Sequence, residues 1–406
     1  MPDTLKNPIL VLNCGSSSIK YALISDSSAT RISGLAENLG LDSARIKHTA
    51  LDGTKTDISL STPHQPKADH TQALKTILES IKAYEPIAVG HRVVHGGREF
   101  SEAVKVTPHV LEEVKRLAVL APLHNPAHAL GIEAVLAIYP DMPQVVVFDT
   151  AFHHTMPPKA YRYAIPTELY SEHYIRRYGF HGTSHNYVSH RADTLAPSKN
   201  DTPNGWITAH LGNGCSLTAV YDGKSLDTSM GLTPLEGVLM GTRSGDIDPG
   251  VHVHLHRTLG YSFDEIDTIL NKKSGWIALS ELSSDMRAIE EAMADSTHEK
   301  HEQATLAHEI FCYKVARYVA SLSCALPVFT GIVFTGGIGE NANLARQKIL
   351  ENLPHFGIVM DDVKNNSLVR GKEGSFHADN SRLQLWVIPT DEEVQILKET
   401  KMVLGL

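Results

Sequence analysis

The fold of this 406-residue chain is decided by Leu10-Val-Leu-Asn-Cys-Gly-Ser-Ser-Ser-Ile-Lys20, which reads as a strand, a tight turn of glycine and serine, and a second strand. A similar stretch, Ala209-His-Leu-Gly-Asn-Gly-Cys-Ser-Leu-Thr-Ala-Val220, follows half a chain later. When Gly15 is placed on Gly214, Leu12 also coincides with Leu211, and Ser17 with Ser216. Such turns point backbone N–H groups and hydroxyls at one spot, which suits an anionic oxygen. The pair predicts a duplicated fold that closes on a nucleotide from both sides.

Composition limits the class of protein. A chain of 406 residues is long enough for two domains, and its net charge of −9 argues against a general nucleic-acid binder. No run approaches eighteen apolar residues, and the first residues do not form a signal peptide. The four cysteines show no metal-binding spacing, and the histidine pair His124 and His128 is more simply structural than a zinc site. We expect a cytoplasmic protein that has no membrane or nucleic-acid partner.

Apolar runs alternate with helical patterns along the chain. Strands are predicted at 9–12, 19–24, 87–89, 145–148, 332–334 and 385–388, and helices at 70–84, 109–120, 127–138 and 289–322. Pro122 and Pro126 are expected to lie in the break between the helices at 109–120 and 127–138. The pattern predicts an α/β protein with mixed sheets flanked by helices, and ligands at the carboxyl ends of strands.

The last helix is expected to begin at Thr390, because Glu393 follows three residues later in the pattern of a capping box. A Glu393 that folds back in this way would leave Glu392 as the freer carboxylate for a metal. Residues 227–250 are rich in glycine and have no period. Such a long aperiodic stretch within a domain is more often functional than idle.

The standard phosphate-binding sequences are missing. The chain has no G-x-x-x-x-G-K-[ST], and Gly337-x-Gly339 does not complete a dinucleotide fingerprint. Phosphate binding must therefore use the two hairpin turns and the turn at Gly337–Asn341, which opens a helix after a buried strand.

Phosphoryl transfer needs cations around the transition state, together with a divalent metal. Arg92 follows a buried strand, and Arg243 lies between small residues that leave its guanidinium free to face phosphate oxygens. His181 is a hydrogen-bond donor in a similar setting. Asp149 ends a strand, where it could bind metal, orient an arginine or cap a turn.

These segments resemble the acetate kinase family. The match includes Asn13–Lys20, Gly90–Gly97, Arg177–His185 and Phe334–Asn341, and above all Met230-Gly-Leu-Thr-Pro-Leu-Glu-Gly-Val-Leu-Met-Gly-Thr-Arg-Ser-Gly-Asp-Ile-Asp-Pro249. The resemblance implies the actin-like (ribonuclease H-like) ATPase fold of the acetate and sugar kinase, Hsp70 and actin superfamily, with an active-site cleft between two domains. It implies an N-terminal acetokinase domain of residues 1–150 plus 391–406, and a nucleotide-binding domain of residues 151–390.

The resemblance also implies roles for individual residues. Asp149, His181, Arg243 and Arg92 would be catalytic, and Asn13 and Glu392 would lie beside Mg²⁺. The acetate would contact Arg92, Val94, Leu123, Phe180 and Pro234. The nucleotide would contact Lys20, His210, Leu211, Gly212, Asn213, Gly214, Asp285, Met286, Arg287, Gly337, Ile338, Gly339, Glu340 and Asn341. The family works as a homodimer.

The implied reaction is reversible, direct in-line transfer of the ATP γ-phosphoryl group to acetate, giving acetyl phosphate and ADP. Acetate is already an anion at neutral pH and needs no general base. Three alternatives remain open: a propionate or other short-chain acyl kinase, a non-metabolic ATP-driven member of the superfamily, and a sugar kinase, which would need a base for a neutral hydroxyl.

Overall fold

The chain separates into two compact units. The computed structural model describes residues 5–15, 17–25, 31–61, 67–122, 124–198 and 202–406. Unit 1 consists of Met1–Phe152 and Asp391–Leu406, and unit 2 of His153–Thr390. The chain therefore leaves unit 1 after residue 152 and returns to it at residue 391.

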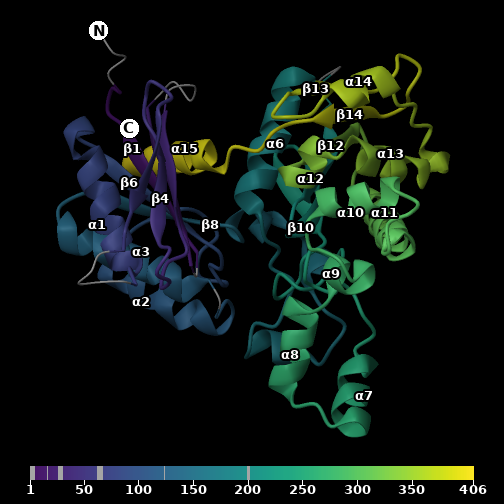
Figure 1. Ribbon diagram of the computed structural model, residues 1–406, viewed down its shortest axis with the longest axis horizontal. Helices are drawn as coiled ribbons and strands as arrows, with labels where there is room; N and C mark the ends of the chain where they lie inside the picture. The colour runs from purple at the N-terminus through teal and green to yellow at the C-terminus, as the bar shows by residue number, and fades with distance from the viewer. Residues whose placement is uncertain (1–4, 16, 26–30, 62–66, 123, 199–201) are drawn as a thin grey trace. The chain divides into compact units, whose positions relative to one another are not determined.

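Unit 1 is built on an eight-stranded mixed sheet with the order β5-β4-β3-β2-β1-β6-β8-β7 (Figure 1). Its strands are β1 (Ile9–Cys14), β2 (Ile19–Ile24), β3 (Arg31–Glu37), β4 (Arg45–Thr49), β5 (Lys55–Ser59), β6 (Ala88–Val93), β7 (Val104–Lys105) and β8 (Gln144–Phe148). The strands β1, β6 and β8 run parallel, and β2 to β5 add an antiparallel meander.

Helices cover both faces of this sheet. They are α1 (His70–Ile81), α2 (Pro108–Arg116), α3 (Asn125–Ile138) and α15 (Glu392–Leu404), with short 3₁₀ turns at Lys82–Tyr84 and Leu117–Val119. Leu10 and Leu12 pack with α1 and α3, whereas Ile9 and Val11 pack with Ile396 of α15 on the opposite face. The period-2 alternation of β1 therefore fills two cores at once.

The expected break between α2 and α3 is present, but Pro126 does not lie in it. It occupies the first turn of α3, where the missing N–H of proline costs no hydrogen bond.

Unit 2 contains a six-stranded sheet with the order β11-β10-β9-β12-β14-β13. Its strands are β9 (Gly205–Leu211), β10 (Cys215–Tyr221), β11 (Lys224–Thr228), β12 (Gly331–Thr335), β13 (Gly374–Ser375) and β14 (Gln384–Val387). The series β11-β10-β9-β12-β14 repeats β3-β2-β1-β6-β8 in order and strand direction. The duplication predicted from the two turns is thus present in the topology of the sheets.

The residue match between the two turns needs a correction. Gly15 opens its turn directly after β1, and its N–H donates to Ser18 O at 2.7 Å. Gly214 instead closes its turn, directly before β10. The two hairpins therefore correspond as strands and turns, but the alignment of Gly15 with Gly214 is two residues out of register at the end of the first strand and three at the start of the second.

The helices of unit 2 include α6 and α11, which pack on the central strands of its sheet, and α7 and α8, which lie away from it (Figure 1). The helices are α4 (Pro158–Tyr161), α5 (Thr167–Ser171), α6 (Gly182–Leu195), α7 (Gly250–Leu259), α8 (Phe263–Lys272), α9 (Gly275–Ser280), α10 (Met286–Ala294), α11 (His301–Ser323), α12 (Gly336–Asn341), α13 (Asn343–Glu351) and α14 (Asp362–Ser367). Short 3₁₀ turns lie at Ala151–Thr155 and Pro354–Phe356. The single helical region expected at 289–322 is two helices, α10 and α11, separated by a turn at residues 295–300.

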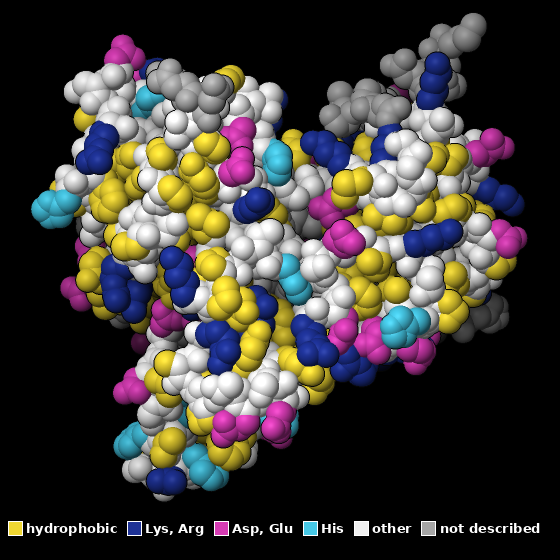
Figure 2. Space-filling model, turned by 180° about the vertical axis from the view of Figure 1, so that it is seen from behind, with side chains coloured by type: hydrophobic (Ala, Val, Ile, Leu, Met, Phe, Trp, Pro, Cys, Tyr) yellow, Lys and Arg dark blue, Asp and Glu magenta, His cyan; other side chains and the backbone are white. Residues whose placement is uncertain are grey.

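Two further features of unit 2 matter for function. Residues 229–249 contain neither helix nor strand, as their composition predicts. The following α7 and α8 and their connection carry exposed apolar side chains: Val251, Val253, Leu259, Tyr261 and Phe263. On the face shown in Figure 2, hydrophobic and histidine side chains lie side by side at the lower end of this unit.

Candidate functional site

The parallel strands of unit 1 bring Asn13, Arg92 and Asp149 together. Leu12 of β1 is in register with His91 of β6, and Val93 of β6 is in register with Phe148 of β8. The three polar residues therefore lie at the carboxyl ends of adjacent strands. The guanidinium of Arg92 donates to both oxygens of Asp149, from Nε at 2.9 Å and Nη2 at 2.5 Å, and Nη1 donates to Asn13 Oδ1 at 3.3 Å.

Carboxylates balance the charge of Arg92. Asp149 is 1% exposed, and the Glu392 carboxylate lies 3.6 Å from Arg92 Nε. Burial alone would lower the pKa of Arg92, but the charges of Asp149 and Glu392 outweigh it and raise that pKa. Of the roles open to Asp149, the structure favours orienting the arginine, because both of its oxygens are used by the guanidinium.

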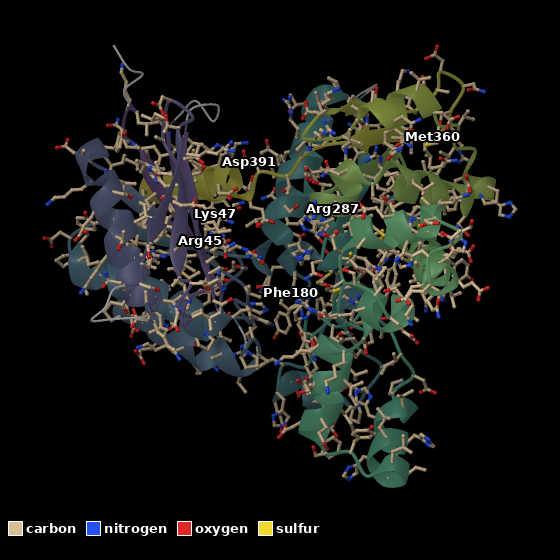
Figure 3. The ribbon with its side chains drawn as sticks, viewed as in Figure 1. Arg45, Lys47, Phe180, Arg287, Met360 and Asp391 are labelled. Atoms are coloured by element: carbon tan, nitrogen blue, oxygen red, sulfur yellow. The ribbon has the colours of Figure 1, made fainter. Side chains whose placement is uncertain are left out.

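The start of α15 differs from the predicted capping box. Asp391, labelled in Figure 3, caps the helix by accepting from Val394 N at 3.2 Å, and it also pairs with Arg31. Glu393 does not fold back, but forms an ion pair of 2.5 Å with Lys20. A helix that begins one residue later changes which side chain can reach its first N–H groups, so Thr390 is not the cap.

Hydrogen bonds fix the turn after β6, which carries Val94. The Asn125 side chain accepts from His95 N at 3.2 Å and donates to His95 O at 3.0 Å, and Gly96 N donates to Thr150 Oγ1 at 3.0 Å. Val94 is buried in this turn. Leu123, its predicted partner in the acetate pocket, lies outside the described residues.

In unit 2, His181 stands at the start of α6 with a left-handed φ of 55°. Its Nδ1 lies 2.9 Å from Ser216 Oγ, and its ring stacks on His210 with centroids 4.3 Å apart. His210 is in turn bonded through Nδ1 to Ser184 Oγ at 2.8 Å. The serine that matched Ser17 in the sequence is thus directed at a histidine.

Arg243 lies beside His181. A Cβ placed on Gly214 would be 3.4 Å from His181 Nε2 and 3.8 Å from Arg243 Nη1, so both side chains reach the same glycine of the β9–β10 turn. Arg243 Nη1 donates to Pro234 O at 3.0 Å. Among the described residues no carboxylate forms an ion pair with Arg243, and burial lowers its pKa. The structure therefore holds an uncompensated positive charge here, the condition for attracting an anion.

The loop that carries Pro234 and Arg243 is held by a polar network. Glu236 accepts from Tyr163 Oη at 2.5 Å and pairs with Arg177 at 2.6 Å, and Tyr163 Oη accepts from Leu232 N at 2.9 Å. Phe180 is buried just before His181 and is labelled in Figure 3. An aperiodic loop fixed in this way can present a side chain with little motion.

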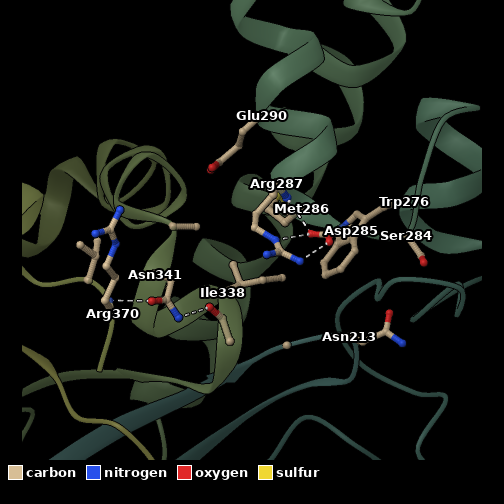
Figure 4. Close-up of a pocket in the computed structure, with 14 residues that line it drawn as sticks. Asn213, Trp276, Ser284, Asp285, Met286, Arg287, Glu290, Ile338, Asn341 and Arg370 are labelled. Atoms are coloured by element: carbon tan, nitrogen blue, oxygen red, sulfur yellow. Dashed lines mark hydrogen bonds and ion pairs between the residues drawn. The ribbon is translucent and has the colours of Figure 1, made fainter. Parts of the chain in front are cut away.

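A pocket of about 930 Å³ lies entirely within unit 2 (Figure 4). Its lining comprises Gly212, Asn213, Trp276, Ser284, Asp285, Met286, Arg287, Glu290, Gly337, Ile338, Asn341, Ala342, Val369 and Arg370. Three sequence stretches that the resemblance assigned to the nucleotide, near residues 212, 286 and 338, meet in this lining. The volume is that of a pocket for a nucleotide-sized ligand.

Hydrogen bonds shape the walls of this pocket. Asp285 caps α10 and pairs with Arg287 at 2.7 Å, while Asn341 Nδ2 donates to Gly337 O at 2.9 Å and Asn341 Oδ1 accepts from Arg370 N at 2.8 Å (Figure 4). Asn341 thus ties α12 to the segment after α14.

Six of the predicted nucleotide contacts do not line the pocket: Lys20, His210, Leu211, Gly214, Gly339 and Glu340. Glu340 accepts instead from Gly336 N at 3.0 Å and Thr390 N at 3.2 Å. These bonds satisfy the turn between β12 and α12, and burial raises the pKa of Glu340.

Six lining residues were not predicted: Trp276, Ser284, Glu290, Ala342, Val369 and Arg370. Ser284 and Ala342 adjoin predicted stretches and could have been included by extension, and Glu290 is one helical turn beyond Met286. Val369 and Arg370 belong to no sequence motif. The residue before them, Leu368, is held in place by Arg346, a fully buried residue of α13. Arg346 donates to Gly339 O, Asn365 Oδ1, Asn365 O and Leu368 O at 2.8 to 3.0 Å.

The oxygen donors around Arg92 fit one kind of metal. In the described part of the chain, no three histidine, cysteine or acidic side chains are grouped so as to hold an ion. Asn13 and Glu392 supply one amide and one carboxylate oxygen near the same guanidinium. Mg²⁺ is commonly bound by one or two carboxylates together with water and substrate phosphates, so this donor set suits it.

Comparison with known proteins gives consistent results. The Acetokinase family profile matches residues 8–398. An acetate kinase of Ectopseudomonas mendocina is 50% identical over 397 residues, covering 98% of this chain and 98% of that protein. An acetate kinase of Shewanella frigidimarina is 49% identical over 399 residues, covering 96% of this chain and 97% of that protein. No helix in the described residues is long and apolar enough to span a membrane.

Solved structures of similar proteins share the fold. A propionate kinase from Francisella tularensis aligns with a TM-score of 0.90 and 44% identity, covering 98% of this chain and 100% of that one. An acetate kinase from Porphyromonas gingivalis aligns with a TM-score of 0.89 and 42% identity, with the same coverage.

Proposed function

Since the chain belongs to the acetokinase family, we propose that it transfers the γ-phosphoryl group of ATP directly to acetate, reversibly, giving acetyl phosphate and ADP. It is a phosphotransferase whose acceptor is a carboxyl group. The single observation that carries the mechanism is the uncompensated Arg243 beside His181 at Gly214. A cation and an imidazole at one turn can receive the negative oxygens of a transferring phosphoryl group.

The chemical step follows from this arrangement. One carboxylate oxygen of acetate attacks the γ-phosphorus while the bond from that phosphorus to the bridging oxygen of ADP breaks in line. Arg243 and His181 donate to the equatorial oxygens, and Arg92, oriented by Asp149, directs its remaining N–H groups to the acid. Arg92 belongs to unit 1, whereas Arg243 and His181 belong to unit 2, so the proposal makes residues of both units necessary for the reaction. We assign residues 1–150 with 391–406 to the acetokinase domain and 151–390 to the nucleotide domain.

We propose that the nucleotide occupies the pocket of unit 2. The Gly212–Asn213 turn would face the phosphates, and the walls formed by Met286 and Ile338 would contact the nucleoside. Asn213 and Gly212 lie directly before Gly214, which both Arg243 and His181 approach. This continuity supports a γ-phosphate placed at the reacting end of the pocket.

Asn13 and Glu392 would hold Mg²⁺, which neutralises phosphate charge when bound. We expect activity to disappear when EDTA exceeds the divalent metal and to return with added Mg²⁺. The measurement is acyl phosphate formation with ATP, and it is repeated on the Glu392→Gln variant at increasing Mg²⁺ concentrations. Because that variant loses one carboxylate oxygen donor, its half-saturating Mg²⁺ concentration should rise. Full activity in EDTA would contradict the proposal for the metal.

The acid substrate is tested by trapping the acyl phosphate with hydroxylamine. We expect kcat/KM to be higher for acetate than for propionate, because the apolar side chains that we propose as contacts of the methyl group, Val94, Phe180 and Pro234, would discriminate one methylene by about 1–3 kcal/mol, or roughly 10- to 200-fold. The similarity to a propionate kinase favours propionate as the second candidate. A higher kcat/KM for propionate would make propionate the preferred acid in place of acetate. If neither acid gives a trapped product, the proposed function is overturned.

We also propose a cytoplasmic homodimer. The exposed apolar residues on and between α7 and α8, from Val251 to Phe263, are of the kind that a second protomer covers. Phe263 alone is 68% exposed, which is costly for so large an apolar side chain in water.

A further inference from the structure

Buried hydrogen bonds link His181 to the interior of unit 2. His181 Nδ1 lies 2.9 Å from Ser216 Oγ, which lies 2.7 Å from His185 Nε2. His185 Nδ1 lies 2.7 Å from Thr208 Oγ1, and that hydroxyl can donate to Thr218 O at 3.4 Å. Ser216, His185 and Thr208 are all fully buried, so no solvent competes for these groups.

The carbonyl at the inner end gives the series a direction. Thr218 O can only accept, so a Thr208 hydroxyl that makes this bond donates to it and is left to accept from His185 Nδ1. Burial, with His153 and His210 nearby, holds the pKa of His185 well below its usual value, so its ring carries one proton. In this direction, that proton is on Nδ1. His185 Nε2 then accepts from the Ser216 hydroxyl, and Ser216 Oγ can accept from His181.

The opposite direction satisfies fewer groups. If His185 carried its proton on Nε2, Thr208 would donate to His185 Nδ1 and would make no bond to Thr218 O. The first direction makes four hydrogen bonds among these residues and the reverse makes three. Buried polar groups favour the arrangement that satisfies the larger number.

We infer that Ser216 and His185 are positioning residues that keep a proton on His181 Nδ1, so that Nε2 is the atom that gains and loses a proton. This inference rests on the proposed function for its catalytic meaning. His181 Nε2 is the ring nitrogen near Gly214, beside Arg243. Neutral His181 would present a lone pair to the phosphoryl group, whereas the imidazolium would donate a hydrogen bond from Nε2. The working form of His181 is therefore the imidazolium.

Several groups of unit 2 surround His181 and influence its proton. His210 stacks on it from β9, Arg243 approaches from the 229–249 loop, Cys215 precedes Ser216 on β10, and His185 lies on α6 with His153 against it. Arg243 opposes protonation, while an incoming phosphate anion favours it. Substrate binding would thus supply the charge that the imidazolium needs.

The first test uses the substrate-free protein, so it does not depend on activity. Long-range ¹H–¹⁵N spectra of ¹⁵N-histidine protein, assigned with His181→Gln, report which nitrogen of neutral His181 carries the proton. We expect Nδ1 in the wild type and a shift to Nε2 in Ser216→Ala, because the partner of one nitrogen decides the tautomer. The matched control is Ser189→Ala, a buried serine of α6 whose hydroxyl donates to Asn186 O on the same helix, and it should change nothing.

The second test measures kinetics. Ser216→Ala should lower kcat by roughly 10- to 100-fold with little change in KM for ATP, and Ser216→Thr, which keeps the hydroxyl, should restore most of it. The residual activity of Ser216→Ala should persist to higher pH than that of the wild type, because its neutral ring still donates from Nε2.

A wild-type proton on Nε2, or equal tautomers in wild type and Ser216→Ala, would overturn the inference even in an active enzyme. If Ser216→Ala fails to fold, the wild-type tautomer decides the matter. Failure of the wild type to form an acyl phosphate would instead overturn the proposed function and leave the tautomer result standing.

Discussion

Arg243→Leu should lower kcat by about 10³- to 10⁵-fold, the range for an arginine that stabilises phosphoryl transfer. The effect is large because Arg243 is the uncompensated cation beside His181 and its charge has no carboxylate partner among the described residues. Nucleotide affinity should change little, since Arg243 does not line the pocket of unit 2. The measurements are hydroxamate formation for kcat and calorimetric titration for ADP.

Stability separates this role from a structural one. Burial disfavours the charge of Arg243, so leucine should leave the free energy of unfolding unchanged or raise it. Arg191→Leu on α6 is the matched control, because it removes a surface pair with Glu373 and should keep full kcat. Arg243→Leu with kcat within tenfold of wild type would show that the cation is not used on the phosphoryl group.

Arg346→Met should lower the free energy of unfolding of unit 2 by about 3–5 kcal/mol. Its guanidinium is the donor for four acceptors on Gly339, Asn365 and Leu368. Each buried acceptor left without a donor costs about 1–3 kcal/mol, and relaxation recovers part of the sum. Because Leu368 directly precedes Val369 and Arg370 of the pocket, KM for ATP should also rise while KM for acetate stays near the wild-type value.

The chain offers a selective probe for this measurement. Its three tryptophans, Trp206, Trp276 and Trp386, all lie in unit 2, so urea unfolding followed by tryptophan fluorescence reports that unit. Lys348→Met is the matched control on the same helix, where an exposed pair with Glu351 should contribute less than about 1 kcal/mol. Equal unfolding midpoints and slopes for Arg346→Met and Lys348→Met would contradict the proposed role of the guanidinium.

Much of the fold follows from local sequence signals. The two hairpins, the apolar strands ending at Phe148 and Thr335, and the aperiodic 229–249 segment are legible because strand alternation and turn composition act over a few residues. The register between the two hairpins was misjudged, because glycine identity marks a turn but not its position within the turn. The cap of α15 was misplaced by one residue for a similar reason, since Thr390, Asp391 and Glu393 offer competing caps.

The candidate site likewise contains residues that local sequence signals could place and residues that they could not. Arg92 and Asp149 could be placed together because Arg92 lies near the end of one parallel strand and Asp149 directly follows the next, and carboxyl ends of such strands share one edge of a sheet. The pairing of Lys20 with Glu393 and the role of Arg346 depend on residues hundreds or tens of positions apart, and no local pattern records such contacts. Ser216 was expected to face an anion, but its burial between two histidines follows from the packing of α6 on β9 and β10.

The return of the chain to unit 1 at residue 391 has a consequence for synthesis. The face of the first sheet that includes Ile9, Val11 and Ala22 is covered by Ile396 and Leu397 of α15, and Glu392 arrives on the same helix. While the ribosome is still extending the chain, that face has no cover, although unit 2 is already contiguous from residue 153 to residue 390. The strands of unit 1 are therefore translated before unit 2 but complete this core only after it, when α15 supplies both the apolar residues that cover the sheet and the carboxylate of Glu392.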